Sequence, residues 1–570
     1  MGATDDATAA VFARAGAIGA DEAKWGSPGS ARTKAHLLRT LLRYGVTVFF
    51  ADADVVILRD PLLYVARQLA SGASLLFHTD GFGSWENALA AASAESEGLE
   101  SPSWGFTPEM NTGLFVATPN ATGLAQRWCD AVASDAAFAN WKNDQQALNE
   151  LLRKGATVPR PHTARSSVVK SAELVISTPA GASSTSEPPL LLGLLPAHLF
   201  PSGHVYFLQR ALRDLPRAPY AVHLTFQNCD QSGKRHRMRE AGLWMIDDAD
   251  AAIAATATAK GTATATAGEH YAPTGGLLSF DLDVPPELSS PYAAQDRNLR
   301  TADAVVQRHF QLVNHQLLQL RTALAIALVL NRTVVLPRFV CGVETVTNFA
   351  HKGIRCLGSN GCRMALPYLC PADHVLRMHY WRGVMPQLPK LRIRYREFSL
   401  LQNVAKRHPA LLQSTYTPSR AVHVKVTDAP ARSCGAACPS EGYDASTQPR
   451  GPTPSSIASA APPERTVTLP AREVTHEDLL SRLAPLARSA PLIHFASLRP
   501  DGLKLKLPKA MQPLFDDTIR HLGGGYCCVE PEKRGSFGHF WYDLLWDVPH
   551  TDRWGRVWTS EKPWVPTPGP

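Results

Sequence analysis

The regular pattern of the chain begins with an amphipathic helix. Over residues 31–44 the apolar side chains recur at helical spacing, and Gly45 follows as a C-cap. The next segment, VTVFFADADVVIL, is continuously apolar up to Asp52, which is typical of a central parallel strand covered on both faces. A second apolar strand, SLLFHTD, ends at Asp80. A helix followed by buried strands predicts an α/β sheet, whose ligands bind beyond the carboxyl ends of the strands.

A second α/β module is predicted in the carboxy-terminal half. It begins with the strand pattern GGLLSFDLDVP, continues with a long helix near residues 304–330, and returns to a strand at TVVLP. The long helix carries Arg308 and Arg321 among its apolar residues, so the sequence favours a core helix over a membrane span.

Composition marks the boundary between the two modules. Residues 251–274 are low in complexity and lack large apolar side chains over most of their length, so we expect an interdomain linker there. This assigns residues 1–250 to the first domain and residues 275–570 to the second. Within the second domain, residues 427–464 are rich in Pro, Ser, Gly and Ala, which predicts a disordered insertion.

Charge and cysteine content narrow the function classes. The net charge of +8 is modest for 570 residues and is not gathered into a basic stripe, so a nucleic-acid partner is not indicated. Four of the ten cysteines lie between Cys341 and Cys370 with spacings that match no common zinc pattern, so disulfides are favoured over a zinc site, with buried thiols as the remaining alternative. Together with acceptor sequons at Asn120 and Asn331, the cysteines favour a secretory lumen.

The pair Asp52 and Asp54 is the strongest chemical signal. Two carboxylates one residue apart, after a strand, can each offer an oxygen to one hard cation such as Mn²⁺ or Mg²⁺. A cation held in this way can neutralise the charge that develops on a leaving nucleotide diphosphate. The same spacing is common in loops without any metal, and position after a buried strand is what favours the metal-binding interpretation here.

Two polar segments downstream are ambiguous by themselves. Asn111, Thr112 and Gly113 precede the apolar run LFVAT, where a side-chain amide could bind sugar hydroxyls or could serve a turn. Asp144 and Gln145 begin a predicted helix, so Asp144 could face a sugar or could be the N-cap.

A third segment adds a histidine and a basic run. His223 ends a short predicted strand, and Gly233 and Lys234 follow. An imidazole can complete a metal site and a lysine can bind phosphate. A structural histidine and a solvated basic face are the alternative interpretation of the same residues.

Taken in order, these four elements resemble the nucleotide-diphospho-sugar transferases of the GT-A class. More closely, the chain resembles the plant and algal glycosyltransferase family 77, which contains arabinosyltransferases of cell-wall hydroxyproline-rich glycoproteins. The segments that carry this resemblance in the first domain are YGVTVFFADADVVILRDP, MNTGLFVATPN, NDQQALNELL and KRHRMREAGLW. In the second domain they are GGLLSFDLDVPPEL, YLCPADHV, HTDRW and the long helix with its following strand.

The resemblance implies roles for individual residues. Asp52, Asp54 and His223 become metal ligands, and Gly233 with Lys234 becomes the diphosphate-binding pair. Asn111, Thr112 and Gly113 would bind sugar or acceptor, and Asp144 with Gln145 would be catalytic. These side chains would lie in a GT-A-type, Rossmann-like nucleotide-sugar domain, followed by the second α/β module.

The resemblance also implies a reaction and a place. The expected enzyme is a retaining glycosyltransferase of the Golgi lumen, a type II membrane protein that uses Mn²⁺ or Mg²⁺ and a UDP-sugar. UDP-arabinofuranose is the expected donor and a hydroxyproline-rich glycoprotein or glycan the expected acceptor. No anchor or signal segment is visible in this sequence, and only fifty-one residues precede Asp52, so we expect the amino-terminal domain to be incomplete.

Other functions remain compatible with the residues. Xylosyl or galactosyl transfer would use the same site. A noncatalytic lumenal scaffold would need no turnover. A phosphatase of the haloacid dehalogenase type would use Asp52 of FFADADVV as a nucleophile.

Overall fold

The computed structural model forms two compact units, Met1–Thr225 with Ile354–Cys362 and Phe226–Gly353 with Arg363–Pro570. It describes residues 2–3, 20–21, 30–80, 109–133, 143–157, 174–176, 190–209, 218–227, 230–244, 276–290, 303–342, 367–381, 393–401, 421–427, 466–487, 490–522, 550–551 and 557–558. The expected linker at 251–274 and all but the first residue of the expected insertion at 427–464 lie outside these ranges.

The first unit is built on a mixed six-stranded sheet. Its strands, in spatial order, are β3 Val48–Ala51, β6 Met110–Ala117, β5 Leu75–Thr79, β9 Leu190–Leu194, β8 Leu174–Ile176 and β7 Ala156–Thr157. Strands β5 and β9 are parallel, and the other neighbouring pairs are antiparallel. A two-stranded ribbon, β4 Val55–Ile57 with β10 Ala221–His223, lies beyond Asp54.

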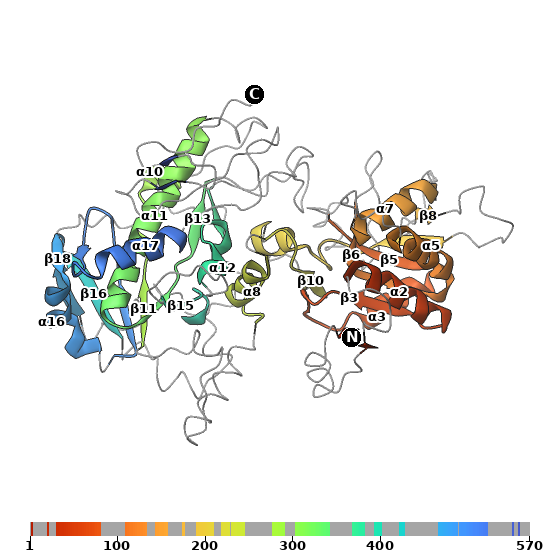
Figure 1. Ribbon diagram of the computed structural model, residues 1–570, viewed down its shortest axis with the longest axis horizontal. Coiled ribbons are helices and arrows are strands. Elements are labelled where there is room, and N and C mark those ends of the chain that lie inside the picture. The colour runs from red at the N-terminus through yellow and green to blue at the C-terminus, as the bar shows by residue number, and fades with distance from the viewer. Residues whose placement is uncertain are drawn as a thin grey trace, which may run out of the picture. The chain divides into compact units, whose positions relative to one another are not determined.

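Helices cover both faces of this sheet (Figure 1). On one face α2 Ser30–Arg43, α5 Thr122–Ala133 and α7 Asp144–Gly155 enclose a core around Phe77 and Phe115. On the other face α3 Leu62–Ala70 packs over Leu76 and Leu114. The alternation of side chains along each strand sends successive residues into the two cores. The predicted helix and the predicted strand at SLLFHTD are therefore both confirmed within an α/β fold.

One sequence prediction about this sheet is wrong. The strand before Asp52 is β3, which lies at the edge of the sheet and pairs antiparallel with β6, so it is neither central nor parallel. Its apolar run is explained by coverage of both faces, since Phe49 packs in one core and Phe50 in the other. Burial of the two faces leaves the same sequence pattern whether or not a strand has neighbours on both sides.

The second unit has a six-stranded sheet in which all paired strands are parallel. The spatial order is β15 Tyr395–Arg396, β12 Thr333–Val335, β11 Leu277–Phe280, β19 Leu492–Phe495, β16 Val422–Thr427 and β17 Thr466–Pro470. Its longer helices are α11 Asp303–Val329, α16 His476–Ala487 and α17 Gln512–Leu522. The predicted second α/β module, with its long helix, is thus observed.

The remaining elements are short. They are β1 Gly2–Ala3, β2 Ala20–Asp21, β13 Phe339–Cys341, β14 Tyr368–Cys370, β18 Glu473–Thr475, β20 Lys504–Lys506, β21 His550–Thr551, β22 Val557–Trp558, η2 Pro119–Ala121, η3 His204–Gln209, η7 Ala372–His374, α10 Pro286–Ser289 and α12 Met378–Trp381. A disulfide joins Cys341 on β13 to Cys370 on β14, which confirms the preference for bridges at this pair. Cys129 is a buried thiol.

Among the described residues, helix α11 has the length and apolar composition that a membrane-spanning helix needs. That stretch is Gln311–Val329, and 67% of it is buried inside the structure. Such burial is typical of a core helix, as the sequence predicts.

Helix α8, Asp230–Glu240, belongs to the second unit. The buried guanidinium of Arg237 donates to both carboxylate oxygens of Asp373, at 2.9 Å and 3.1 Å, and lies 2.9 Å from His374 Nε2. The Arg239 carbonyl accepts a hydrogen bond from Ser399. The two units consequently divide at Thr225 and Phe226, whereas the sequence places a boundary after residue 250.

Candidate functional site

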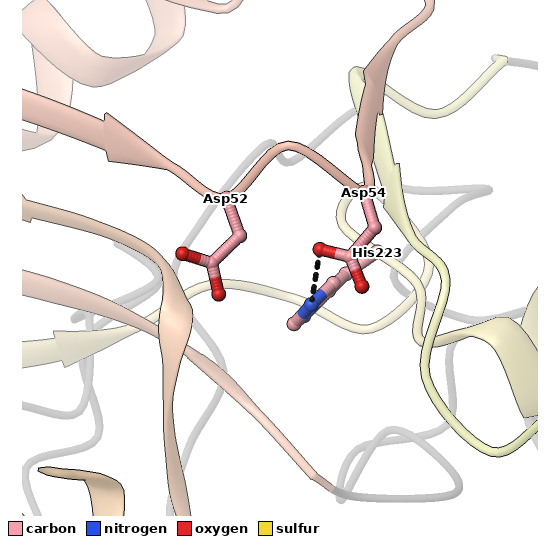
Figure 2. Close-up of side chains that lie close together, drawn as sticks. All are labelled: Asp52, Asp54 and His223. Carbon is pink, nitrogen blue, oxygen red and sulfur yellow. Dashed lines mark ion pairs between the residues drawn. The ribbon is translucent and has the colours of Figure 1, made fainter. Parts of the chain in front are cut away.

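Asp52 and Asp54 lie on a tight turn between β3 and β4. The Val55 N–H donates to the Asp52 carbonyl at 3.0 Å, and the Asp52 N–H donates to the Gly113 carbonyl at 2.7 Å. The Asp54 carbonyl in turn accepts a bond from the Leu224 N–H at 3.1 Å. These backbone bonds fix the turn, and both carboxylates leave it on the same side (Figure 2).

His223 meets this pair from a distant part of the chain. It is the last residue of β10, as the sequence predicts, and it lies opposite Val55 of β4. Its Nε2 is 3.4 Å from Asp54 Oδ1 (Figure 2), and ligand atoms of Asp52, Asp54 and His223 all lie within 4.8 Å of one another. Carboxylate oxygens and an imidazole nitrogen at this spacing are a suitable ligand set for Mn²⁺.

Gly113 leaves the space that this cluster needs. A Cβ at this position would lie 2.3 Å from His223 Cε1 and 2.9 Å from Asp52 Oδ2. The glycine is therefore required by the close approach of two ligands to β6. Sequence reasoning assigns it to sugar or acceptor binding, and the structure gives it a steric role.

Asn111 and Gln145 bind the half-buried carboxylate of Asp80, to which sequence reasoning gave no role. Asn111 Nδ2 donates to Asp80 Oδ1 and Gln145 Nε2 donates to Asp80 Oδ2, both at 2.7 Å. Burial raises the pKa of Asp80, and these two hydrogen bonds act against that rise. Asn111 Oδ1 also accepts from the Gly113 N–H at 2.7 Å, so Asn111 fixes the backbone at the glycine.

Asn143 is the N-cap of α7, and this leaves the side chain of Asp144 available for other contacts. Asn143 Oδ1 accepts from the Gln146 N–H at 2.8 Å, and Gln146 Oε1 accepts from the Asn143 N–H at 3.1 Å, which is a reciprocal capping box. Asp144 is consequently not needed as the cap. Its Oδ2 instead accepts from Thr112 Oγ1 at 3.0 Å, so the alternative of a capping role is removed.

Lys34 of α2 is a site residue that sequence reasoning missed. Its Nζ lies 3.0 Å and 3.2 Å from the two oxygens of Asp52, 3.3 Å from Asp144 Oδ2 and 3.1 Å from the Thr112 carbonyl. A usable signal was present, because Lys34 lies four residues before the buried Leu38 on the apolar stripe of the helix. A lysine on such a stripe indicates a buried partner.

His78 packs against the metal-ligand candidate His223. The two rings are 5.5 Å apart in an edge-to-face arrangement. Burial, and next the charge of His223, hold the pKa of His78 well below its ordinary value. His78 is therefore neutral and adds no positive charge beside the three candidate ligands.

Gly233 and Lys234 lie on α8 in the second unit. Gly233 is buried and Lys234 is half-buried. Because these residues and the cluster around Asp52 belong to different units, the diphosphate-binding role of Gly233 and Lys234 stays a prediction.

Two comparisons with known proteins match this site and the chain as a whole. Residues 21–238 match the family model of the nucleotide-diphospho-sugar transferases, a range that includes every candidate site residue named above. The chain is also 27% identical over 562 residues to arabinosyltransferase XEG113 of Arabidopsis thaliana, and the alignment covers 95% of this chain and 68% of the relative. The predicted resemblance is thereby confirmed over both units.

Proposed function

We propose that this chain, a glycosyltransferase with a nucleotide-diphospho-sugar transferase domain at residues 21–238, transfers arabinose from a UDP-sugar in a reaction that depends on a divalent cation. The observation that carries the cation dependence is the convergence of Asp52, Asp54 and His223 within 4.8 Å. The choice of arabinose as the transferred sugar rests on the relative from Arabidopsis thaliana, an arabinosyltransferase.

Asp52, Asp54 and His223 are the residues that would hold the cation, Mn²⁺ or Mg²⁺. When bound there, the cation supplies charge neutralisation to a departing diphosphate. Lys34 contacts the carboxylates of Asp52 and Asp144, and Asp54 lies beside Asp52 and His223, so the local excess of carboxylates favours a divalent cation. Lys234 with Gly233 would add the phosphate contacts that the sequence predicts.

Asp144 is the carboxylate best placed to act on the sugar. Thr112 and Lys34 hold its Oδ2 by a hydrogen bond and an ion pair, so the group is oriented. A retaining transfer could use Asp144 as a nucleophile or could proceed by attack on the same face of the sugar. Gln145 and Asn111 would act through the neighbouring Asp80.

The acceptor we propose is a hydroxyproline-rich glycoprotein or a related glycan, and the compartment is the Golgi lumen, with a type II membrane arrangement. The disulfide between Cys341 and Cys370 supports an oxidising compartment. Xylosyl or galactosyl transfer is the neighbouring alternative, because it needs the same cation and diphosphate chemistry.

The test is release of UDP by the full chain with Mn²⁺ and a panel of UDP-sugars. We expect turnover with UDP-arabinofuranose, and loss of at least about 100-fold in Asp54→Asn. Asp60→Asn is the matched control, since Asp60 is exposed and its Oδ1 accepts a bond from the Leu62 N–H, which an asparagine oxygen also accepts.

Each alternative predicts a different result in this assay. Turnover with UDP-xylose or UDP-galactose in place of UDP-arabinofuranose would reassign the donor sugar. No turnover with any donor would favour a scaffold. Phosphate release from a simple phosphomonoester, independent of the sugar, would favour the phosphatase.

A further inference from the structure

A row of polar side chains crosses three adjacent strands of the second unit. Ser279 of β11, His494 of β19 and His423 of β16 are neighbours in the parallel register. Residues paired in register project from the same face of a sheet. This face therefore carries a serine and two histidines side by side on three adjacent strands.

The row lies where the strand order of the sheet reverses. From β11 the chain continues to β12 and β15 on one side, whereas β16, β17 and β19 lie on the other side. In open parallel sheets, ligands bind beyond the carboxyl ends of the strands at such a switch point. Asp281 directly follows β11 at this end.

The imidazole of His494 contacts Ser279 with one ring nitrogen and faces Asp281 with the other. Its Nδ1 lies 2.9 Å from Ser279 Oγ, and its Nε2 lies 3.4 Å from Asp281 Oδ2. The side chain is 3% exposed, and Nε2 has no hydrogen-bond partner among the described residues. A histidine whose Nδ1–H is bound by a fixed acceptor presents the lone pair of Nε2, which is the usual arrangement of a metal-ligating imidazole.

Asp281 is the carboxylate available at this place. In the segment Asp281-Leu282-Asp283, Asp283 Oδ2 already accepts a hydrogen bond from Ser497 Oγ at 2.9 Å. The side chain of Asp281 is 37% exposed, and its Oδ2 lies 3.4 Å from His494 Nε2. His423 is half-buried, with its ring 5.5 Å from the ring of His494.

We propose that the second unit binds a Zn²⁺-type divalent cation through His494 Nε2 and Asp281, with His423 as the third ligand. Metal bonds of about 2.1 Å to both atoms are compatible with a separation of 3.4 Å between them at a near-tetrahedral angle. The ligand atoms of His423, His494 and Asp281 are not gathered in the structure as those of the first unit are, so the proposal requires His423, whose ring lies 5.5 Å from that of His494, to change rotamer. Two imidazoles and one carboxylate favour Zn²⁺ over Mn²⁺ or Mg²⁺.

A simple ion pair is the competing explanation of the contact. A charged imidazole paired with a carboxylate forms a short hydrogen bond, with a separation of about 2.7–2.9 Å. The observed 3.4 Å, with Nε2 making no hydrogen bond, is longer than this range. The cation site of the first unit shows the same relationship, because His223 Nε2 is also 3.4 Å from Asp54 Oδ1.

The test uses the untagged full chain with Asp52→Asn and Asp54→Asn, so that the site of the first unit is disabled. We expect this protein to bind one equivalent of Zn²⁺ in calorimetric titration, and addition of Asp281→Asn or His494→Gln to weaken that binding at least about tenfold. Asp283→Asn is the matched control, since its amide oxygen can still accept from Ser497 and its affinity should equal that of the background.

The results divide cleanly. Absence of Zn²⁺ binding in the background, or equal binding in the Asp281→Asn and His494→Gln variants, would overturn the proposal. An equal loss in Asp283→Asn would also overturn it, because it would indicate general acidity in place of a defined ligand. If His494→Gln does not fold, the partly exposed Asp281 decides the outcome. None of these results depends on glycosyltransferase turnover.

Discussion

Lys34 and Asp52 form an ion pair in which the lysine Nζ lies 3.0 Å and 3.2 Å from the two carboxylate oxygens. The same oxygens are proposed to bind the cation. The ammonium of Lys34 therefore competes with the cation for Asp52 and repels it at short range. Lys34 also contacts Asp144, so the position of this lysine links the proposed metal site to the proposed catalytic carboxylate.

Replacing this lysine should strengthen cation binding. We expect Lys34→Met to lower the dissociation constant for Mn²⁺ about tenfold, because a positive charge within a few ångströms of the ligands is removed. Lys34→Arg keeps the charge and is the control. Electron paramagnetic resonance of free Mn²⁺ measures the affinity, and unchanged or weaker binding in Lys34→Met would contradict the proposed competition.

Adding one methyl group at position 113 should disable the site. In Gly113→Ala the new Cβ would meet His223 and Asp52 at less than 3.0 Å, so both side chains must shift. We expect Mn²⁺ binding and turnover to fall by at least about 100-fold, which is the effect of disturbing two ligands. Circular dichroism should show the wild-type content of helix and strand. Retention of Mn²⁺ affinity would mean that the cation binds elsewhere.

Asn149 should contribute strongly to the stability of the first unit. Its side chain accepts from the Met110 N–H and donates to the Met110 carbonyl, both at 2.8 Å, while it is 3% exposed. Asn149→Ala leaves both backbone groups of Met110 buried without these partners, so we expect a loss of about 3 kcal/mol in the free energy of unfolding. Urea denaturation followed by fluorescence measures this. A loss below about 1 kcal/mol would show that water replaces the amide.

Acid should destabilise the first unit through a buried histidine. Burial lowers the pKa of His198 from 6.5 to about 4. The unfolded chain therefore takes up a proton at higher pH than the folded chain, and the stabilising difference present above pH 6.5 is lost as pH falls towards 4. The expected loss in the free energy of unfolding between pH 7 and pH 4 is about 3 kcal/mol, and this loss should be absent in His198→Phe. Thermal unfolding at pH 7, 6, 5 and 4 tests it, and parallel curves for both proteins would exclude this role.

The residue pattern indicates Asp52 and Asp54 as metal-ligand candidates, and the family resemblance adds His223. Asp52 and Asp54 are marked by their position after an apolar strand, and the structure brings His223 to them through the pairing of β10 with β4. The two strands are far apart in the sequence, and the residues around His223 left a structural histidine open, so its role as a ligand was implied by the family resemblance. The helices and the second α/β module were also predictable, because each has a long periodic pattern.

Other parts of the site depend on tertiary contacts that leave weak sequence signals. The ion pair of Lys34 with Asp52 joins a helix to a turn, and the position of Lys34 on the apolar stripe indicates a buried partner without indicating which carboxylate it is. The position of β3 at the sheet edge depends on which strands pair with it, and a strand's own residues do not report that. The role of Asn143 as the cap was not recognised because Asp144 is an equally good capping residue by type.

The pairing of Arg237 with Asp373 has a practical consequence for expression of the enzyme. A shortened clone that stops within the low-complexity tract would carry α8 but lack the acidic partner of its buried arginine. Without Asp373 and His374, the guanidinium of Arg237 would lose the charged and polar partners that it has in the second unit, which destabilises α8. Preparations intended to isolate the nucleotide-sugar half should therefore either end before Phe226 or supply the remaining half in trans.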